Sequence, residues 1–205
     1  MSLASLSLPV PPPQSLYRIN LDTYHRMIET GLLSPRDKVV LTQGLLVKTT
    51  SKGPRHVRAI AKVMASLLPV LPGGWFLRKE DPITLPLAPD GYGSEPEPDV
   101  AVVRGTSDDY GTSHPQPADV RLVIEVADSS LKEDRDGLAQ LAWEEIPVVW
   151  IINLRDRVVQ VYDAPTAAGP ESHYQQCATK RAGDVLDLIL PDIAILGVRV
   201  DDLLP

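Results

Sequence analysis

The sequence predicts an α/β (α+β) fold in which a mixed central β-sheet is flanked by helices. Two observations lead to this prediction. Short runs of β-branched and aliphatic residues recur between residues 75 and 162, and apolar residues with helical spacing occur before these runs and between them. The chain has 205 residues, of which 43% are hydrophobic, so it can bury one sizeable core. We therefore expect a single domain over residues 16–205.

The N-terminal segments predict a leader, a short helix and a pair of strands. Residues 1–15 contain three consecutive prolines, which favour a disordered or extended leader. The stretch NLDTYHRMIETGLL predicts a helix with Asn20 or Asp22 near its cap and Gly31 at its end. Two strand-like runs follow on either side of Gly44, where we expect a turn or bulge.

An amphipathic helix is predicted from Pro54. Its apolar positions follow the i, i+3, i+4, i+7 pattern and are Val57, Ile60, Ala61, Met64, Leu67 and Leu68. The opposite face carries Arg55, Arg58 and Lys62, with Lys52 just before the helix. This basic stripe is either an ordinary solvated helix face or a surface that binds nucleic-acid phosphates.

The second half of the chain predicts most of the sheet. Strands are expected at residues 75–79, 100–103, 121–127, 148–152 and 157–162, a helix at 134–145, and shorter strands between 185 and 200.

Charge and cysteine content narrow the possible partners and compartment. The net charge of −7 argues against nucleic acid, but residues 38–79 contain no acid and include eight lysines and arginines. Cys177 is the only cysteine, which excludes an internal disulfide and favours a reducing, cytoplasmic location. No apolar run approaches the roughly 18 residues that span a bilayer, so we expect no membrane partner.

Two acids lie where apolar strand residues surround them. Asp99 begins the run VAVV, and Glu125 lies inside LVIEVA. A buried carboxylate must be paired, protonated or bound to a cation. Glu125 alone could instead face solvent from an edge strand or pair with an arginine, and Pro-Asp is also common in turns. Together, the two acids can converge at one end of the sheet and bind Mg²⁺ or Mn²⁺.

Four segments carry a resemblance to a known family, and they occur in the order RDKVVLTQGLLVKTTSKGPRHVRAIAKV, SEPEPDVAVVR, HPQPADVRLVIEVADSSLKEDRD and IPVVWIINLRDRVVQVY. This ordered set resembles the bacterial putative restriction endonuclease family (Uma type) within the PD-(D/E)XK nuclease superfamily. The resemblance covers roughly residues 16–205. It implies a restriction-endonuclease-like core that hydrolyses DNA with a divalent metal ion.

The resemblance also implies roles for particular residues. Asp99 and Glu125 match the catalytic, metal-binding acids of the family, and the main-chain carbonyl of Val126 matches the third ligand. These residues would hold Mg²⁺ or Mn²⁺ at the scissile phosphate.

The sequence departs from the family pattern at ionisable positions. The family lysine follows the glutamate strand in a pattern like D-R-x-x-K, and DRDGL places Leu138 there. Upstream, Val40 and Leu45 stand where the family usually has acids. Loss of a general base or charge stabiliser costs on the order of 10²- to 10⁴-fold in rate. Lys132 or Lys79 are candidate substitutes.

The sequence thus supports more than one function. The first is a metal-dependent DNA endonuclease whose activity is impaired by the loss of the family lysine. The alternative is a catalytically inactive family member that binds nucleic acid through Lys52, Arg55, Arg58 and Lys62, or that acts as a homodimeric interaction module.

Overall fold

The computed structural model describes residues 16–86, 92–128, 131–190 and 193–205, apart from the side chains of residues 132, 133, 136, 170 and 193–196. The leader predicted for residues 1–15 lies outside the described residues.

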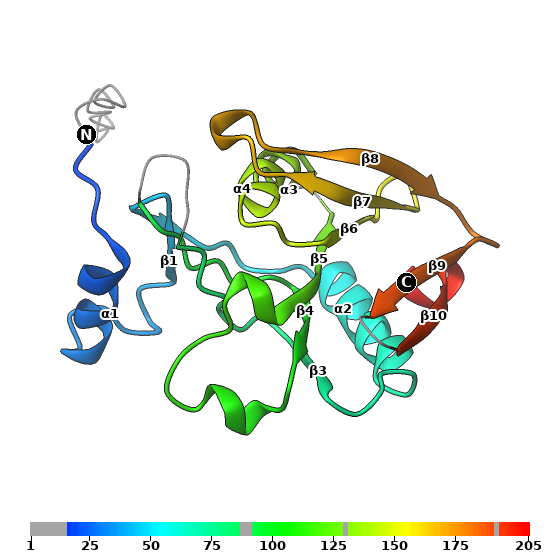
Figure 1. Ribbon diagram of the computed structural model, residues 1–205, viewed down its shortest axis with the longest axis horizontal. Coiled ribbons are helices and arrows are strands. Elements are labelled where there is room, and N and C mark those ends of the chain that lie inside the picture. The colour runs from blue at the N-terminus through cyan, green and yellow to red at the C-terminus, as the bar shows by residue number, and fades with distance from the viewer. Residues whose placement is uncertain (1–15, 87–91, 129–130, 191–192) are drawn as a thin grey trace, which may run out of the picture.

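The described chain forms helices and strands in an alternating order (Figure 1). The α-helices are α1 (Leu21–Glu29), α2 (Pro54–Leu67), α3 (Leu131–Asp136), α4 (Leu138–Trp143) and α5 (Val200–Leu203). The strands are β1 (Val39–Thr42), β2 (Leu45–Lys48), β3 (Trp75–Arg78), β4 (Val100–Arg104), β5 (Val120–Ala127), β6 (Val148–Asn153), β7 (Val158–Thr166), β8 (His173–Lys180), β9 (Val185–Leu190) and β10 (Ile193–Arg199). Short 3₁₀ helices are η2 (Ser107–Tyr110), η3 (Pro117–Asp119) and η4 (Gly169–Glu171).

A six-stranded mixed sheet forms the centre of the fold, with the order β3-β4-β5-β6-β7-β8. Strands β5 and β6 are parallel, and the other neighbours in this sheet are antiparallel. The parallel pair requires a crossover connection, which α3 and α4 provide. The predicted fold class, a mixed sheet flanked by helices, is therefore confirmed.

Both faces of the sheet are covered, so successive residues of its central strands enter different cores. In β4, Val100 and Val102 belong to a core shared with α2, α5 and the β9–β10 hairpin. Ala101 and Val103 belong to a second core, which α4 covers from the opposite face. Figure 1 shows α2 beside β9 and β10, and α3 and α4 beside β7 and β8. This double coverage explains why these strands are almost continuously apolar.

The N-terminal part follows the sequence prediction closely. The Asn20 side chain accepts a hydrogen bond of 2.9 Å from the backbone N–H of Thr23 and caps α1. Strands β1 and β2 pair as an antiparallel hairpin whose turn contains Gly44 with φ of +76°. A side chain at Gly44 would also come within 2.9 Å of the Ile19 carbonyl oxygen, so both conformation and space require glycine.

Three predicted details are wrong. The helix expected at 134–145 is two short helices, and β8 was not predicted because its side chains are mostly polar and exposed. The apolar face of α2 is rotated from the predicted one: Val57, Ala61 and Leu68 are exposed, and Ala59 and Val63 are buried instead. The small side chain of Ala59 suits the close approach of α2 to the sheet.

Among the residues described, no helix is both long and apolar enough to cross a membrane.

Two adjacent leucines at the end of α2, Leu67 and Leu68, test which face of the helix is buried. Leu67→Ala should lower the free energy of unfolding by about 2–5 kcal/mol, because Leu67 is completely buried in the α2 core. Leu68→Ala should change it by less than about 0.5 kcal/mol, because Leu68 is 64% exposed. Urea denaturation measures both values. Equal losses in the free energy of unfolding for the two variants would show that the buried face of α2 is not the one described here.

Candidate active site

The register of the β4–β5 pair brings Asp99 and Glu125 together. Val100 pairs with Ile124, so the residue before Val100 lies opposite the residue after Ile124. The backbone N–H of Asp99 points at Oε2 of Glu125, at a distance of 3.4 Å. The two acids, which are far apart in sequence, therefore lie side by side at one end of the sheet. Their role as metal ligands stays a prediction.

Asp99 is almost fully buried and is held by three donors. The Lys52 ammonium lies 2.5 Å from Oδ1 and His56 Nε2 lies 3.0 Å from the same oxygen. The backbone N–H of Val126 donates to Oδ2 at 2.7 Å. Burial works to raise the pKa of Asp99, but the hydrogen bonds from His56 and Lys52 outweigh it and hold the pKa below its usual value. Asp99 is therefore a stable carboxylate.

Glu125 lies in the opposite electrostatic situation. Burial raises its pKa well above the usual value, and the nearby carboxylates of Asp99 and Asp134 raise it further. Lys52 acts on it only weakly in the other direction. The pair thus consists of one carboxylate that accepts hydrogen bonds from Lys52, His56 and Val126, and one that is disfavoured in its charged form.

The start of α2 delivers the basic groups to the carboxylates. Arg55 donates to the main-chain carbonyl of Leu154 at 3.1 Å and lies 3.4 Å from a carboxylate oxygen of Asp128. These contacts fix the first turn of α2 against the residues that follow β5 and β6. Lys52 precedes the helix and His56 lies in its first turn, so both reach Asp99.

Lys52 also contacts a third carboxylate, at the edge of a cleft. Its ammonium lies 2.8 Å from Oε1 of Glu80, whose pKa is lowered mainly by this hydrogen bond. The two residues line a cleft of about 630 Å³ together with Lys38, Val40, Thr49, Thr50, Ser51, Pro96 and Glu97. The cleft therefore opens beside the carboxylate pair and carries lysine and hydroxyl groups.

The donor chemistry of the pair fits a hard divalent cation. Two adjacent carboxylates supply oxygen ligands, and a bound cation would offset the cost of burying the charged form of Glu125. Mg²⁺ commonly keeps several waters and needs only one or two carboxylates. In the described part of the chain, no group of three or more His, Cys, Asp or Glu side chains is arranged to hold a metal. Asp99, Glu125 and the Val126 carbonyl are the candidate ligands.

The other residues singled out in the sequence have different surroundings. The side chain of Lys132 lies outside the described residues. Lys79 is 48% exposed, and its ammonium lies 3.4 Å from Glu80. Leu138, where the resemblance predicts a lysine, is partly buried and packs against the core that α4 covers.

The predicted basic stripe is divided between two environments. Lys52 and Arg55 make the contacts at the carboxylate site described above. Arg58 is exposed and has no ion pair or hydrogen bond among the described residues, and Lys62 is partly buried. Only Arg58 and Lys62 therefore form a surface that is independent of the site.

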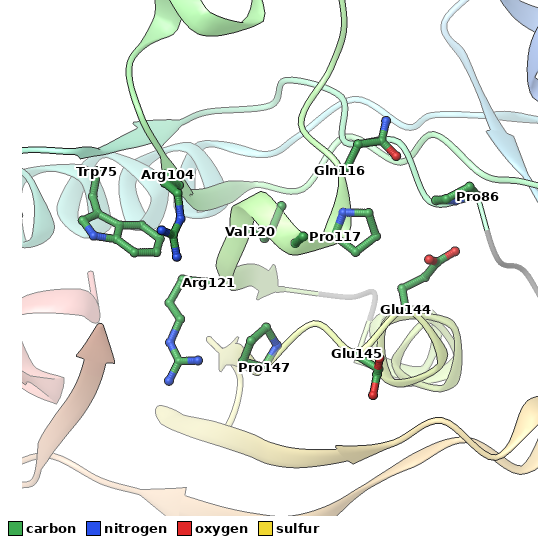
Figure 2. A pocket seen from close by; sticks show the side chains of 11 residues that line it. Trp75, Pro86, Arg104, Gln116, Pro117, Val120, Arg121, Glu144, Glu145 and Pro147 are labelled. Atoms are coloured by element: carbon green, nitrogen blue, oxygen red, sulfur yellow. The ribbon is translucent and has the colours of Figure 1, made fainter. Parts of the chain in front are cut away.

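A separate cavity of about 380 Å³ lies at the other end of β4 (Figure 2). Figure 2 shows Trp75 and Arg104 at one end of it and Glu144 at the other. The Arg104 guanidinium lies over the Trp75 ring, 5.2 Å from its centroid. Arg104 lies five positions after Asp99 along the chain, a separation of about 17 Å in a strand. This cavity is therefore distinct from the carboxylate site.

Sequence reasoning missed three features of the site. Lys52 was assigned to DNA binding only, although its ammonium contacts Asp99. His56 was not assigned, and it is 13% exposed and contacts the same carboxylate. Glu80 was not singled out, because a lone Lys-Glu dipeptide before a turn carries no signal. Only the fold brings these groups to one point.

Comparisons with known proteins identify the family and the fold. The sequence profile of the Uma2 family, described as "Putative restriction endonuclease", matches residues 21–199. Among solved structures, the chain is similar to a putative nuclease belonging to DUF820 from Anabaena variabilis, with a TM-score of 0.61 and 15% sequence identity. The similarity covers 90% of this chain and 97% of the other. No curated protein matches the sequence.

The raised pKa of Glu125 predicts a pH-dependent effect on stability. A carboxyl group with a raised pKa in the folded state favours folding below its unfolded pKa, and this contribution is lost as pH rises through the folded pKa. Without divalent ions, Glu125→Gln should therefore raise the melting temperature at pH 7, by at least about 2 °C. At pH 4 the difference should disappear.

Thermal denaturation in EDTA at the two pH values measures this effect. The matched control is Glu29→Gln, which changes an exposed glutamate of α1. A lower melting temperature for Glu125→Gln at pH 7 would contradict the electrostatic description of the pair.

Proposed function

Because the chain belongs to the putative restriction endonuclease family, we propose that it hydrolyses DNA phosphodiester bonds with a divalent metal ion at Asp99 and Glu125. The observation that carries this proposal is the adjacency of the two carboxylates at the sheet end, where Asp99 N–H lies 3.4 Å from Glu125 Oε2. Mg²⁺ or Mn²⁺ suits these ligands. The cleft lined by Lys52 and Glu80 is the side from which a substrate strand would approach.

The proposed reaction is the addition of water to a phosphodiester. The water oxygen forms a bond to phosphorus while the bond to one ester oxygen breaks, and the electron pair of that bond goes to the leaving oxygen. The water releases one proton and the leaving oxygen takes one, so a phosphomonoester and a hydroxyl result. A divalent ion at this site would polarise the phosphate and lower the pKa of bound water.

Each residue of the site has a proposed contribution. Asp99 and Glu125 hold the ion, and the Val126 N–H fixes the orientation of Asp99. His56 positions Asp99 from the other side. Arg58 and Lys62 on α2, with Lys38 in the cleft, contact the DNA backbone.

A second candidate function is nucleic-acid binding without cleavage. It is favoured by one observation: Leu138, for which the resemblance predicts a lysine, is apolar and partly buried against the core, and it carries no charge to the site. Binding and cleavage therefore require separate assays.

Substitution of either acid should abolish cleavage. Asp99→Asn and Glu125→Gln should each lower the single-turnover rate on duplex or single-stranded DNA with Mn²⁺ by about 10²- to 10⁴-fold. Asp187→Asn, which changes an exposed acid of β9, should leave the rate unchanged. Cleavage that persists in both site variants would rule out this site.

DNA binding should be electrostatic and should depend on the exposed face of α2. The affinity should fall steeply with salt, and Arg58→Ala and Lys62→Ala should each reduce the slope of log K against log salt by about 1. Fluorescence anisotropy at several salt concentrations measures this dependence. Arg181→Ala, an exposed arginine between β8 and β9, is the control. Unchanged slopes in both α2 variants would contradict the proposed DNA surface.

A further inference from the structure

Lys52 occupies an unusual position between the carboxylate pair and the cleft. Its ammonium lies 2.5 Å from Asp99 and 2.8 Å from Glu80, and its side chain is 30% exposed. Asp99 is nearly buried at the sheet end, whereas Glu80 lies on the cleft wall. The Lys52 ammonium therefore contacts both the candidate metal site, at Asp99, and the cleft wall that a substrate would reach, at Glu80.

The Lys52–Asp99 contact uses a carboxylate oxygen that a metal ion would need. A carboxylate has about four lone-pair positions, and Asp99 already accepts from Lys52, His56 and the Val126 N–H. A divalent ion and an ammonium cannot share Oδ1 closely, because like charges repel. Occupation of this oxygen by a metal therefore requires Lys52 to withdraw.

Glu80 provides a place to which the ammonium can withdraw. It already contacts Lys52, and its backbone N–H donates to the main-chain carbonyls of Pro98 and Asp99, so its place does not depend on what the Asp99 side chain contacts. An ammonium held by Glu80 alone would keep two of its three donors available toward the cleft. That is the side from which a phosphate would approach.

We infer that Lys52 is the cation of this site: it occupies Asp99 until a divalent ion displaces it, and then, held by Glu80, it binds the scissile phosphate. This inference rests on the proposed function, and it assigns the charge-stabilising role to Lys52 rather than to Lys132 or Lys79. Lys52 remains an ammonium throughout the hydrolysis. It stabilises the negative charge that gathers on the non-bridging phosphate oxygens, and it takes no part in the net proton transfer.

The displacement of Lys52 from Asp99 by a metal ion, which we call the exchange, can be tested by metal affinity without a cleavage assay. Lys52→Met keeps the length of the side chain and removes its charge. It should bind Mn²⁺ about 3- to 5-fold more tightly than the wild type, because no ammonium competes for Asp99. Isothermal titration of the full chain with Mn²⁺ alone measures this change. Unchanged or weaker Mn²⁺ binding by a folded Lys52→Met variant would overturn the exchange.

Cleavage tests the catalytic role. At saturating Mn²⁺, Lys52→Met should lower the single-turnover rate by about 10²- to 10⁴-fold although its metal site is filled. Glu80→Gln, which removes the second anchor, should give a smaller loss. Lys79→Met is the matched control, because Lys79 contacts Glu80 but has no contact with Asp99 among the described residues, and it should change the rate less than about 2-fold.

The outcomes separate this inference from the proposed function. If the wild type cleaves DNA and Lys52→Met cleaves it at the same rate, the role of Lys52 is overturned and the proposed function stays intact. The same holds if cleavage is lost in Lys132→Met but kept in Lys52→Met. A wild type that binds Mn²⁺ but cleaves no DNA would overturn the proposed function and the catalytic role together, and the Mn²⁺ titration would still decide the exchange. Should Lys52→Met fail to fold, Lys52→Gln takes its place in both assays.

Discussion

The burial of two adjacent carboxyl groups, Asp99 and Glu125, is the constraint around which this end of the molecule is organised. The β4–β5 register forces the two carboxylates together, and burial makes their charge costly. The backbone N–H groups of Val126 and Asp99 supply part of the hydrogen bonding, and side-chain donors must reach the pair from outside the two strands. The start of α2 supplies Lys52 and His56, so the path of the chain before and into α2 is tied to the electrostatics of the sheet end.

The same need explains why α2 is held so firmly at its first turn. Arg55 binds the Leu154 carbonyl and lies beside Asp128, so the helix start is fixed to the ends of two central strands. Farther along, Ile60, Val63 and Leu67 are buried against the sheet. Apolar packing therefore orients the helix, and polar contacts set the position of its first turn. A small shift of α2 would separate Lys52 from Asp99.

Two positions for which the resemblance predicts charge carry apolar side chains at different places in the fold. Val40 lines the cleft, and Leu138 is partly buried against the core that α4 covers. The Lys52–Glu80 pair places a lysine and an acid at the same cleft from other parts of the chain. The cleft therefore carries both charges close to the carboxylate pair.

Sequence alone determined most of the elements and the positions of the two acids beside apolar strand residues. Their apolar flanks required burial, and burial made Asp99 and Glu125 conspicuous, so local pattern was sufficient to find them. The face of α2 that is buried, the split of the helix between β5 and β6, and the presence of β8 depended on packing against distant residues. Likewise, no feature of the neighbouring sequence distinguishes Lys52 from the other lysines, or Glu80 from an acid that is exposed to solvent. Only the tertiary structure decided that they meet, because a contact between charges depends on distance in space and not on spacing along the chain.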